Sequence, residues 1–497
     1  ACPTTPEESA MTVTRPSLNS DDVPTPCTWD AMSLSRAIHA RDISCREVMT
    51  AYLGHIEAVN PRVNAIVSLR DGDALLHEAD ARDAELARGV SRGWLHGIPQ
   101  AIKDLAMTAG LRTTFGSPLL ADNVPQTDSI VVERMKRDGA IVIGKTNVPE
   151  FGLGSHSYNP VFGATGNAYD PGLCAGGSSG GAAVALALRM LPVADGSDMM
   201  GSLRNPAAFN NVYGFRPSFG RVPFGPAPEV FGQQLVTEGP MARTVPDLAR
   251  LLATQAGADP RVPLSLDEDP AMFTAPLDRD INGLRIAWMG DWNGHLPMEP
   301  GILPLCEQAL ATFRDLGAEV DAALPDFDPD RLWRCWLTLR HWGVAGSIGA
   351  FYDDPEKREM LKPEAQWEVE GALSLTGRDI HAANVSRTAW QAALTRLLER
   401  YDVVALPTAQ VFPFAIEQSW PQEIAGRGMD TYHRWMEVVI PGSLSGHPVI
   451  SIPAGFNTSG LPMGLQLIGR HRGDLDLLRI ARAYERAAGP EFTRRPW

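Results

Sequence analysis

The sequence predicts an α/β protein in which helices cover both faces of one sheet. Three observations lead to this prediction. Helical and strand patterns alternate along most of the chain, the strand patterns are short and apolar, and no internal repeat or low-complexity linker divides the 497 residues.

The N-terminal part begins with residues 1–29, whose Pro, Thr, Asp and Ser content predicts a loose arm. Helical patterns follow at 33–40, 44–59 and 73–88. Ser44 and Glu47 have the spacing of a capping box, so we expect the second of these helices to begin there.

Helix and strand patterns then alternate to the C-terminus, as the fold class requires. We expect strands at 97–104, 140–144, 191–194, 283–289, 403–406, 448–453 and 462–468, and helices at 129–137, 182–190 and 474–487. Residues 290–440 are more helical and rich in tryptophan, which indicates an elaboration on the sheet rather than a separate domain.

The net charge of −15 argues against two classes of partner, because an acidic surface repels both nucleic acid and anionic lipid. No apolar run approaches the roughly 20 residues that span a bilayer. The longest, 182–194, is interrupted by Arg189 and Pro192. The six cysteines of the chain are scattered and lack the spacing of metal ligands, and the first ten residues lack the form of a signal peptide. Together these features favour a cytoplasmic protein with reduced thiols.

Residues 175–206 carry the most informative pattern, in which two loops of small residues flank a helical and then an extended piece. Nine helical residues advance about 14 Å, and four or five extended residues return about 15 Å. Ser178 in the first loop and Ser202 in the second can therefore be neighbours in space.

The chemistry of such loops points to attack on a carbonyl. The segment from Asp198 to Ser202 offers consecutive backbone N–H groups that could bind an oxyanion, and Arg204 could hold the loop through Asp195 or Asp198. Lys103 ends a short apolar strand, where burial would lower its pKa and make it a base. Flexible turns and a solvated lysine are the alternatives, and the residues alone leave them open.

The sequence resembles the amidase signature family from about residue 30 to the C-terminus. The central motifs are AIKD at Lys103, GGSSGG at Ser178 and GSDMMGSLRNPA at Ser202. Further matching blocks are Thr113–Ser117, Gly144–Asn147 with Glu150 and Phe151, Gly239–Arg243, Leu406–Thr408, Gly446–Pro448 and Gly464–Gly469.

The resemblance implies one α/β/α domain over 30–497 with a mixed sheet of about eleven strands. It also implies that Ser202 is the acylated nucleophile, and that Ser178, after a cis peptide from Gly177, passes protons to neutral Lys103. The implied oxyanion hole consists of the N–H groups of Met199, Met200, Gly201 and Ser202, and the implied supporting residues are Gly177, Ser179, Asp198 and Arg204. No cofactor or metal is implied. Family members commonly have Gly at the position of Met200, so the oxyanion geometry could differ here.

Two other motifs are disfavoured by their context. Gly139–Thr146 fits the P-loop pattern, but its middle residues favour a strand over an open phosphate loop. Gly176–Gly180 fits the nucleophile elbow of α/β-hydrolases, yet Asp170 and Pro171 interrupt the strand that should precede it.

The leading functional hypothesis is hydrolysis of a small-molecule carboxylic amide, with carbamates and esters open to the same chemistry. Nine of the twelve tryptophans lie in 288–435, and they could line a channel for a bulky aryl or alkyl substrate or simply fill the core; Trp333, Cys335 and Trp336 are candidates for such a wall. The alternative is the glutaminase subunit of a tRNA-dependent amidotransferase. The sequence does not determine the oligomeric state, and a homodimer stays open.

Overall fold

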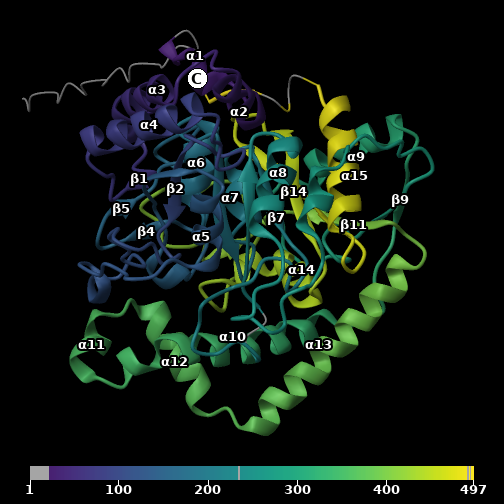
Figure 1. The fold of residues 1–497 in the computed structure, drawn as a ribbon. Coiled ribbons are helices and arrows are strands. Elements are labelled where there is room, and N and C mark those ends of the chain that lie inside the picture. Colours follow the sequence, from purple (N-terminus) through teal and green to yellow (C-terminus); the bar gives the residue numbers. More distant parts are fainter. Residues whose placement is uncertain (1–21, 233–234, 490–491, 493, 497) are drawn as a thin grey trace, which may run out of the picture.

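The computed structural model describes residues 22–232, 235–489, 492 and 494–496. Its centre is a mixed eight-stranded sheet with helices on both faces, so the expected α/β class is confirmed (Figure 1). The strand order is β10 (Glu319–Ala322), β9 (Arg285–Trp288), β11 (Val403–Pro407), β15 (Pro462–Ile468), β14 (Val449–Phe456), β7 (Tyr213–Arg216), β8 (Thr237–Ala242) and β6 (Val193–Asp198).

The strand count of the central sheet differs from the expected eleven, because three strands form a sheet of their own. Its order is β1 (Ile66–Val67), β3 (Ile141–Thr146) and β2 (Pro99–Lys103). β2 lies beside β6, but the two strands are linked by hydrogen bonds that involve side chains instead of a backbone ladder. Gln100 Nε2 donates to the Val193 carbonyl at 2.7 Å, and the Lys103 N–H donates to the Asp195 carboxylate at 3.1 Å. Two hairpins stand apart from both sheets, β4 (Tyr158–Asn159) with β5 (Gly163–Ala164) and β12 (Glu423–Ile424) with β13 (Arg427–Gly428).

Three helices of the N-terminal part match the sequence patterns, namely α2 (Ala31–Ala40), α3 (Cys45–Val59) and α4 (Gly72–Ala87). The sequence does not predict the short helix α1 (Thr25–Thr28), which lies within the expected arm. The capping box of α3 is confirmed, because Ser44 Oγ accepts the Glu47 N–H at 3.1 Å and Glu47 accepts the Ser44 N–H at 2.8 Å.

The middle and C-terminal parts add further helices, several of which pack on the central strands. They are α5 (Ile130–Arg137), α6 (Gly180–Ala187), α7 (Arg204–Phe209), α8 (Val245–Gln255), α9 (Ile302–Asp315), α14 (Ile440–Ser445) and α15 (Asp474–Ala487). α6 packs against β6, α7 against β7, β14 and β15, and α9 against β14 and β15. The predicted strand and helix ranges between residues 97 and 487 thus correspond to observed elements.

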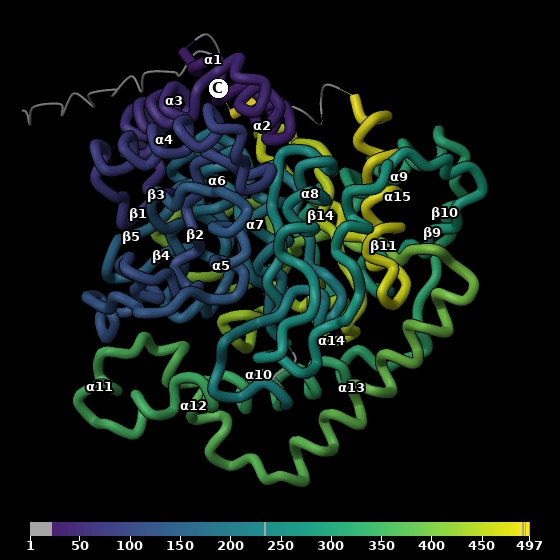
Figure 2. Tube along the Cα trace, in the orientation of Figure 1, coloured from purple at the N-terminus to yellow at the C-terminus, as the bar shows by residue number. Residues whose placement is uncertain are grey.

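The region 290–440 contributes an extended helical segment. It consists of α9, α10 (Pro329–Tyr352), α11 (Pro355–Met360), α12 (Pro363–Leu373) and α13 (Gly377–Leu398), with β10 and β11 among them. Figure 2 shows α10 to α13, in green, on the side of the molecule opposite the purple helices α1–α4. Val344, Ile348 and Val369 belong to a small core cluster of this segment, separate from the main core.

Most of the expected N-terminal arm, residues 1–21, lies outside the described residues, and α1 occupies part of the rest. The five cysteines of the described chain are free and buried. Among the described residues, no helix has the length and apolar character needed to cross a membrane.

Two motif alternatives are settled by the fold. Gly144, Lys145 and Thr146 lie inside the buried strand β3, so the P-loop pattern is a chance match. The Gly176–Gly180 segment follows isolated bridge residues rather than a strand, which does not fit a nucleophile elbow.

The packing of α13 gives a stability prediction. Trp390 is fully buried on this helix and its Nε1 donates to the Pro441 carbonyl at 3.0 Å. Trp390→Ala removes a large buried side chain and should lower the free energy of unfolding by about 3–5 kcal/mol. Leu373→Ala, at a residue that is 69% exposed, should change it by less than about 0.5 kcal/mol. Urea denaturation measures both, and equal effects would contradict the packing described here.

Candidate active site

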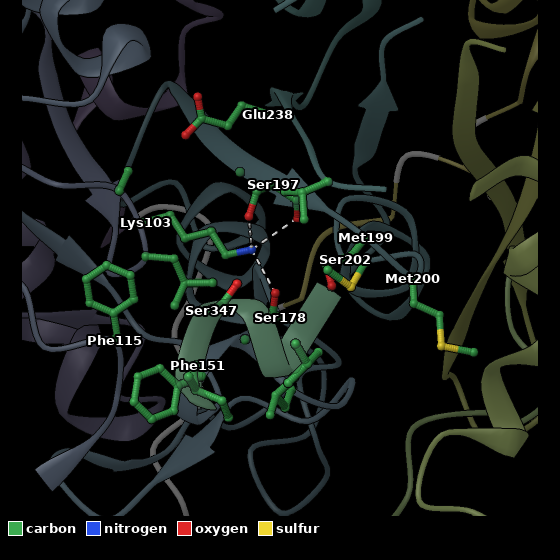
Figure 3. A pocket seen from close by; sticks show the side chains of 18 of the residues that line it. Lys103, Phe115, Phe151, Ser178, Ser197, Met199, Met200, Ser202, Glu238 and Ser347 are labelled. Atoms are coloured by element: carbon green, nitrogen blue, oxygen red, sulfur yellow. Dashed lines mark hydrogen bonds between the residues drawn. The ribbon is translucent and has the colours of Figure 1, made fainter. Parts of the chain in front are cut away.

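Lys103 is the last residue of β2, and its side chain is buried among hydroxyl groups. Its Nζ lies 2.8 Å from Ser178 Oγ, 2.8 Å from Ser179 Oγ and 3.0 Å from Ser197 Oγ. It also donates to the Ser197 carbonyl at 3.1 Å (Figure 3). The alternative of a solvated lysine is therefore wrong, since the residue is 1% exposed.

Burial lowers the pKa of Lys103 to about 7, although the carboxyl groups of Asp195, Asp198 and Glu238 partly offset this effect. The contacts suit a neutral amine. A carbonyl oxygen can only accept, so one N–H points to Ser197, and a second N–H serves one of the hydroxyls. The nitrogen lone pair is then available to accept a hydrogen bond from Ser178.

Ser178 lies immediately before α6, and the Gly177–Ser178 peptide bond is cis, as the resemblance implies. The side chain of Ser155 bonds to both backbone groups of Gly177, the residue before Ser178. Ser155 Oγ donates to the Gly177 carbonyl at 2.7 Å and accepts the Gly177 N–H at 3.1 Å. The backbone that carries Ser178 is thus fixed by hydrogen bonds from a separate loop.

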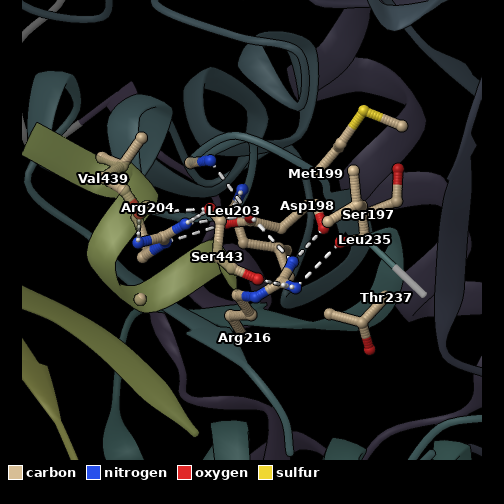
Figure 4. Close-up of polar contacts among 12 residues, drawn as sticks. Ser197, Asp198, Met199, Leu203, Arg204, Arg216, Leu235, Thr237, Val439 and Ser443 are labelled. Carbon is tan, nitrogen blue, oxygen red and sulfur yellow. Dashed lines mark hydrogen bonds and ion pairs between the residues drawn. The ribbon is translucent and has the colours of Figure 1, made fainter. Parts of the chain in front are cut away.

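The loop that carries Ser202 is organised by the buried carboxylate of Asp198 (Figure 4). Arg204 contacts this carboxylate twice, at 3.0 and 3.1 Å, and Arg216 contacts it at 3.2 Å. Burial favours the neutral acid, but the two guanidinium groups outweigh this effect and the pKa of Asp198 lies well below its usual range. Of the two partners considered for Arg204, Asp198 is the correct one.

The backbone amides of this loop do not all have the same role. The Gly201 N–H donates to Asp198 Oδ1 at 2.9 Å, so it is not available for an oxyanion in this structure, contrary to expectation. The N–H groups of Met199, Met200 and Ser202 donate no hydrogen bond within the described part of the chain. Gly201 instead serves the turn, because its φ is +79° and a Cβ there would meet Asn205 and Val439.

Ser178 and Ser202 lie on the same pocket, as the sequence predicts, and the Ser179 N–H donates to the Ser202 carbonyl at 3.2 Å. The hydroxyls of Ser178 and Ser202 are not hydrogen-bonded to each other. The structure therefore contains the contact between lysine and the first serine, while the contact between the two serines would require movement of a side chain.

A cavity of about 380 Å³ opens onto these groups, and its wall is mainly apolar. The lining includes Leu105, Phe115, Leu120, Phe151, Met199, Met200, Phe224, Val344, Ile348 and Phe351. None of the tryptophans that the structure describes lines it. The wall assigned to Trp333, Cys335 and Trp336 is thus wrong, because these side chains are buried in the core.

Sequence reasoning missed three polar groups at this site. Ser197 contacts Lys103, Arg216 supports Asp198, and Glu238 lines the cavity from β8. Ser197 and Glu238 lie in strands whose pairing is not visible from the sequence. Nowhere in the described residues do three or more His, Cys, Asp or Glu side chains form a group that could hold a metal ion.

Comparison with known proteins places the chain among amide-cleaving enzymes. The model of the Amidase family matches residues 47–478. An acylamidase of Rhodococcus erythropolis is 33% identical over 474 residues, which cover 94% of this chain and 95% of the relative. A glutamyl-tRNA(Gln) amidotransferase subunit of Chloroflexus aurantiacus is 35% identical over 474 residues, with coverages of 90% and 94%. The crystal structure of a bacterial aryl acylamidase of the amidase signature family superposes with a TM-score of 0.87 and 30% identity, and covers 94% of this chain and 98% of that one.

The buried Asp198 cluster gives a second stability prediction. Asp198→Asn keeps the shape of the side chain but leaves Arg204 and Arg216 without their counter-charge, which should cost about 3–5 kcal/mol of unfolding free energy. Glu133→Gln breaks an ion pair with Arg261 in which both side chains are 40% exposed, and it should cost less than about 1 kcal/mol. Urea denaturation compares the two variants; a cost for Asp198→Asn no larger than that for Glu133→Gln would contradict the assigned role.

Proposed function

The chain belongs to the Amidase family and is an amide-hydrolysing enzyme, and we propose that it cleaves bulky aryl or alkyl amides through an acyl-enzyme on Ser202. The observation that carries this proposal is the 2.8 Å contact between the buried Lys103 amine and Ser178 Oγ, at the edge of a cavity that Ser202 also lines. A base with a pKa of about 7 is suited to activating a serine at neutral pH.

Acylation would begin with the proton relay. Ser202 Oγ attacks the carbonyl carbon of the substrate, its proton passes to Ser178 Oγ, and the proton of Ser178 passes to neutral Lys103. A rotation of the Ser202 side chain would bring its hydroxyl into hydrogen-bonding contact with Ser178. The charge that develops on the carbonyl oxygen would be stabilised by the N–H groups of Met199, Met200 and Ser202, which have no other acceptor among the described residues.

The relay would then run in reverse. The C–N bond breaks as Lys103, through Ser178, returns a proton to the leaving amine, and the acyl group stays on Ser202. A water molecule attacks this ester, gives one proton to the relay, and releases the carboxylic acid as Ser202 recovers its hydrogen. Gly177, Ser179, Asp198 and Arg204 would hold the two loops in place, and no step requires a cofactor.

The substrate class follows from the cavity wall. Its apolar and aromatic side chains suit a bulky, uncharged acyl or aryl group, and the likeness to an acylamidase and an aryl acylamidase supports the same choice. Carbamates and esters pass through the same acylation step, so we include them as slower or side substrates.

The second candidate is the glutaminase component of a tRNA-dependent amidotransferase. The identity of 35% with a glutamyl-tRNA(Gln) amidotransferase subunit favours it. The apolar cavity fits the small polar glutamine side chain poorly, which is why we rank this function second. Glutaminase turnover together with co-purification of partner subunits would reverse the order.

We also propose the cytoplasm as the compartment of the enzyme, because the cysteines that the structure describes are free and buried. A small-molecule amide is its proposed partner, and a homodimer is one assembly to examine by light scattering.

The nucleophile is tested with a panel of anilides, p-nitrophenyl esters, carbamates and glutamine. We expect the wild-type protein to hydrolyse anilides fastest, and Ser202→Ala to lower kcat by a factor on the order of 10⁴–10⁶. Ser374→Ala, at an exposed residue outside the cavity, should retain the wild-type rate. Undiminished turnover by Ser202→Ala would remove Ser202 from the nucleophile role, and a preference for glutamine would favour the second candidate.

The protonation state of Lys103 gives a pH prediction. Below its pKa of about 7 the amine is an ammonium group with no lone pair, so kcat/KM for an anilide should fall about tenfold per pH unit on the acid side and level off above pH 7. Lys103→Ala should abolish both the activity and this dependence. A wild-type profile that stays flat from pH 5 to pH 8 would show that no group with this pKa acts as the base.

A further inference from the structure

The carboxyl group of Glu238 lies on the wall of the cavity and has no hydrogen-bond partner among the residues that the structure describes. The residue is 5% exposed, and its Oε2 is fully buried without a donor. A buried polar group in this condition costs stability unless a ligand satisfies it. Neither the proton relay nor the support of the loops gives this side chain a role.

The pairing of β6 with β8 fixes the position of this carboxyl group. Glu238 is the partner of Ser197 in the antiparallel register, so the two side chains project from the same face of the sheet. Ser197 Oγ in turn contacts Lys103 Nζ at 3.0 Å. Glu238 therefore lies beside Ser197, on the far side of it from the catalytic serines, and it is part of the cavity lining (Figure 3).

The charges around Glu238 favour a cationic ligand. Burial, together with the charge of Asp195, raises the pKa of Glu238 to about 8, while the charges of Lys103 and Arg134 act in the opposite direction. Of the bases on the cavity wall, Arg340 is already paired with Glu368, and the pKa of Lys103 is about 7. The described lining thus has no cation free to pair with this carboxyl group.

We propose that Glu238 is a specificity residue that binds an amine on the substrate, so that the enzyme prefers amides with a protonated amino group at the far end of an apolar acyl or aryl part. An ammonium group brings three N–H donors and a positive charge, so it can donate to the carboxyl group from the cavity and oppose the field of Asp195. This inference rests on the proposed function, since it concerns the substrate of the same cavity.

The test uses two matched pairs of anilides. The first pair carries the amine on the acyl side, 4-aminobutyryl anilide against pentanoyl anilide, and the second on the aryl side, 4-(aminomethyl)acetanilide against 4-ethylacetanilide. The quantity compared is the ratio of kcat/KM within a pair, so that a general loss of activity in a variant cancels.

We expect wild-type protein to prefer the amine in one pair by about tenfold or more, the factor that a hydrogen bond to a charged group contributes. The preference should increase from pH 6.5 to pH 9 as Glu238 ionises, because the alkylamine stays protonated over most of this range. Glu238→Gln should reduce it to about twofold or less, and Glu238→Asp should retain part of it. The control is Glu150→Gln. This residue carries a buried carboxyl group that does not line the cavity and that accepts a hydrogen bond from Ser117 Oγ at 2.7 Å.

A binding measurement separates this inference from the proposed function. Calorimetry with 4-phenylbutylamine and 4-phenylbutan-1-ol should show about tenfold tighter binding of the amine to wild-type protein and no such difference in Glu238→Gln. Equal binding of the two compounds, or an amine preference that survives Glu238→Gln, would overturn the role of Glu238. If no anilide is hydrolysed but the amine binds through Glu238, the proposed reaction fails and the amine site stands.

Discussion

The join between β2 and β6 is the constraint on which both the fold and the site depend. The two strands are not connected by a backbone ladder. Instead, the Lys103 N–H bonds to the Asp195 carboxylate, while the Lys103 amine reaches the hydroxyl of Ser197 on the same strand. This arrangement ends the central sheet at eight strands and buries a lysine at the same place. Burial lowers the pKa of the amine, and a lysine with a lowered pKa is what an activated serine needs.

A second constraint is the charge of Asp198, which shapes the loop in front of Ser202. Its carboxylate accepts the N–H groups of Gly201 and Leu203 and pairs with two arginines. The loop amides that Asp198 does not use are those of Met199, Met200 and Ser202, and these can face a developing negative charge. Fully buried ion pairs contribute little net stability, because desolvation offsets the attraction. Here these contacts hold the backbone of the loop that precedes Ser202.

The sequence predicts those parts of the molecule that depend on local pattern. The start of α3 follows from Ser44 and Glu47, and the nearness of Ser178 and Ser202 follows from the lengths of α6 and β6. Features that depend on pairing between distant segments could not be predicted. The burial of Lys103 requires β6 beside β2, and the place of Glu238 requires the register of β6 with β8. Tryptophan content suggested an aromatic channel, but large aromatic side chains also fill cores, and here Phe, Met and aliphatic side chains form the apolar wall.

The most direct test of the central claim, that a buried neutral amine activates Ser202 through Ser178, is covalent labelling. The wild-type protein is treated with a fluorophosphonate across a range of pH, and the modified residue is located and quantified by mass spectrometry. The account predicts a single label on Ser202, formed at a rate that rises with a midpoint near pH 7 and is lost in Lys103→Ala. A label on Ser178, or labelling of Ser202 that is unaffected by the loss of Lys103, would contradict it.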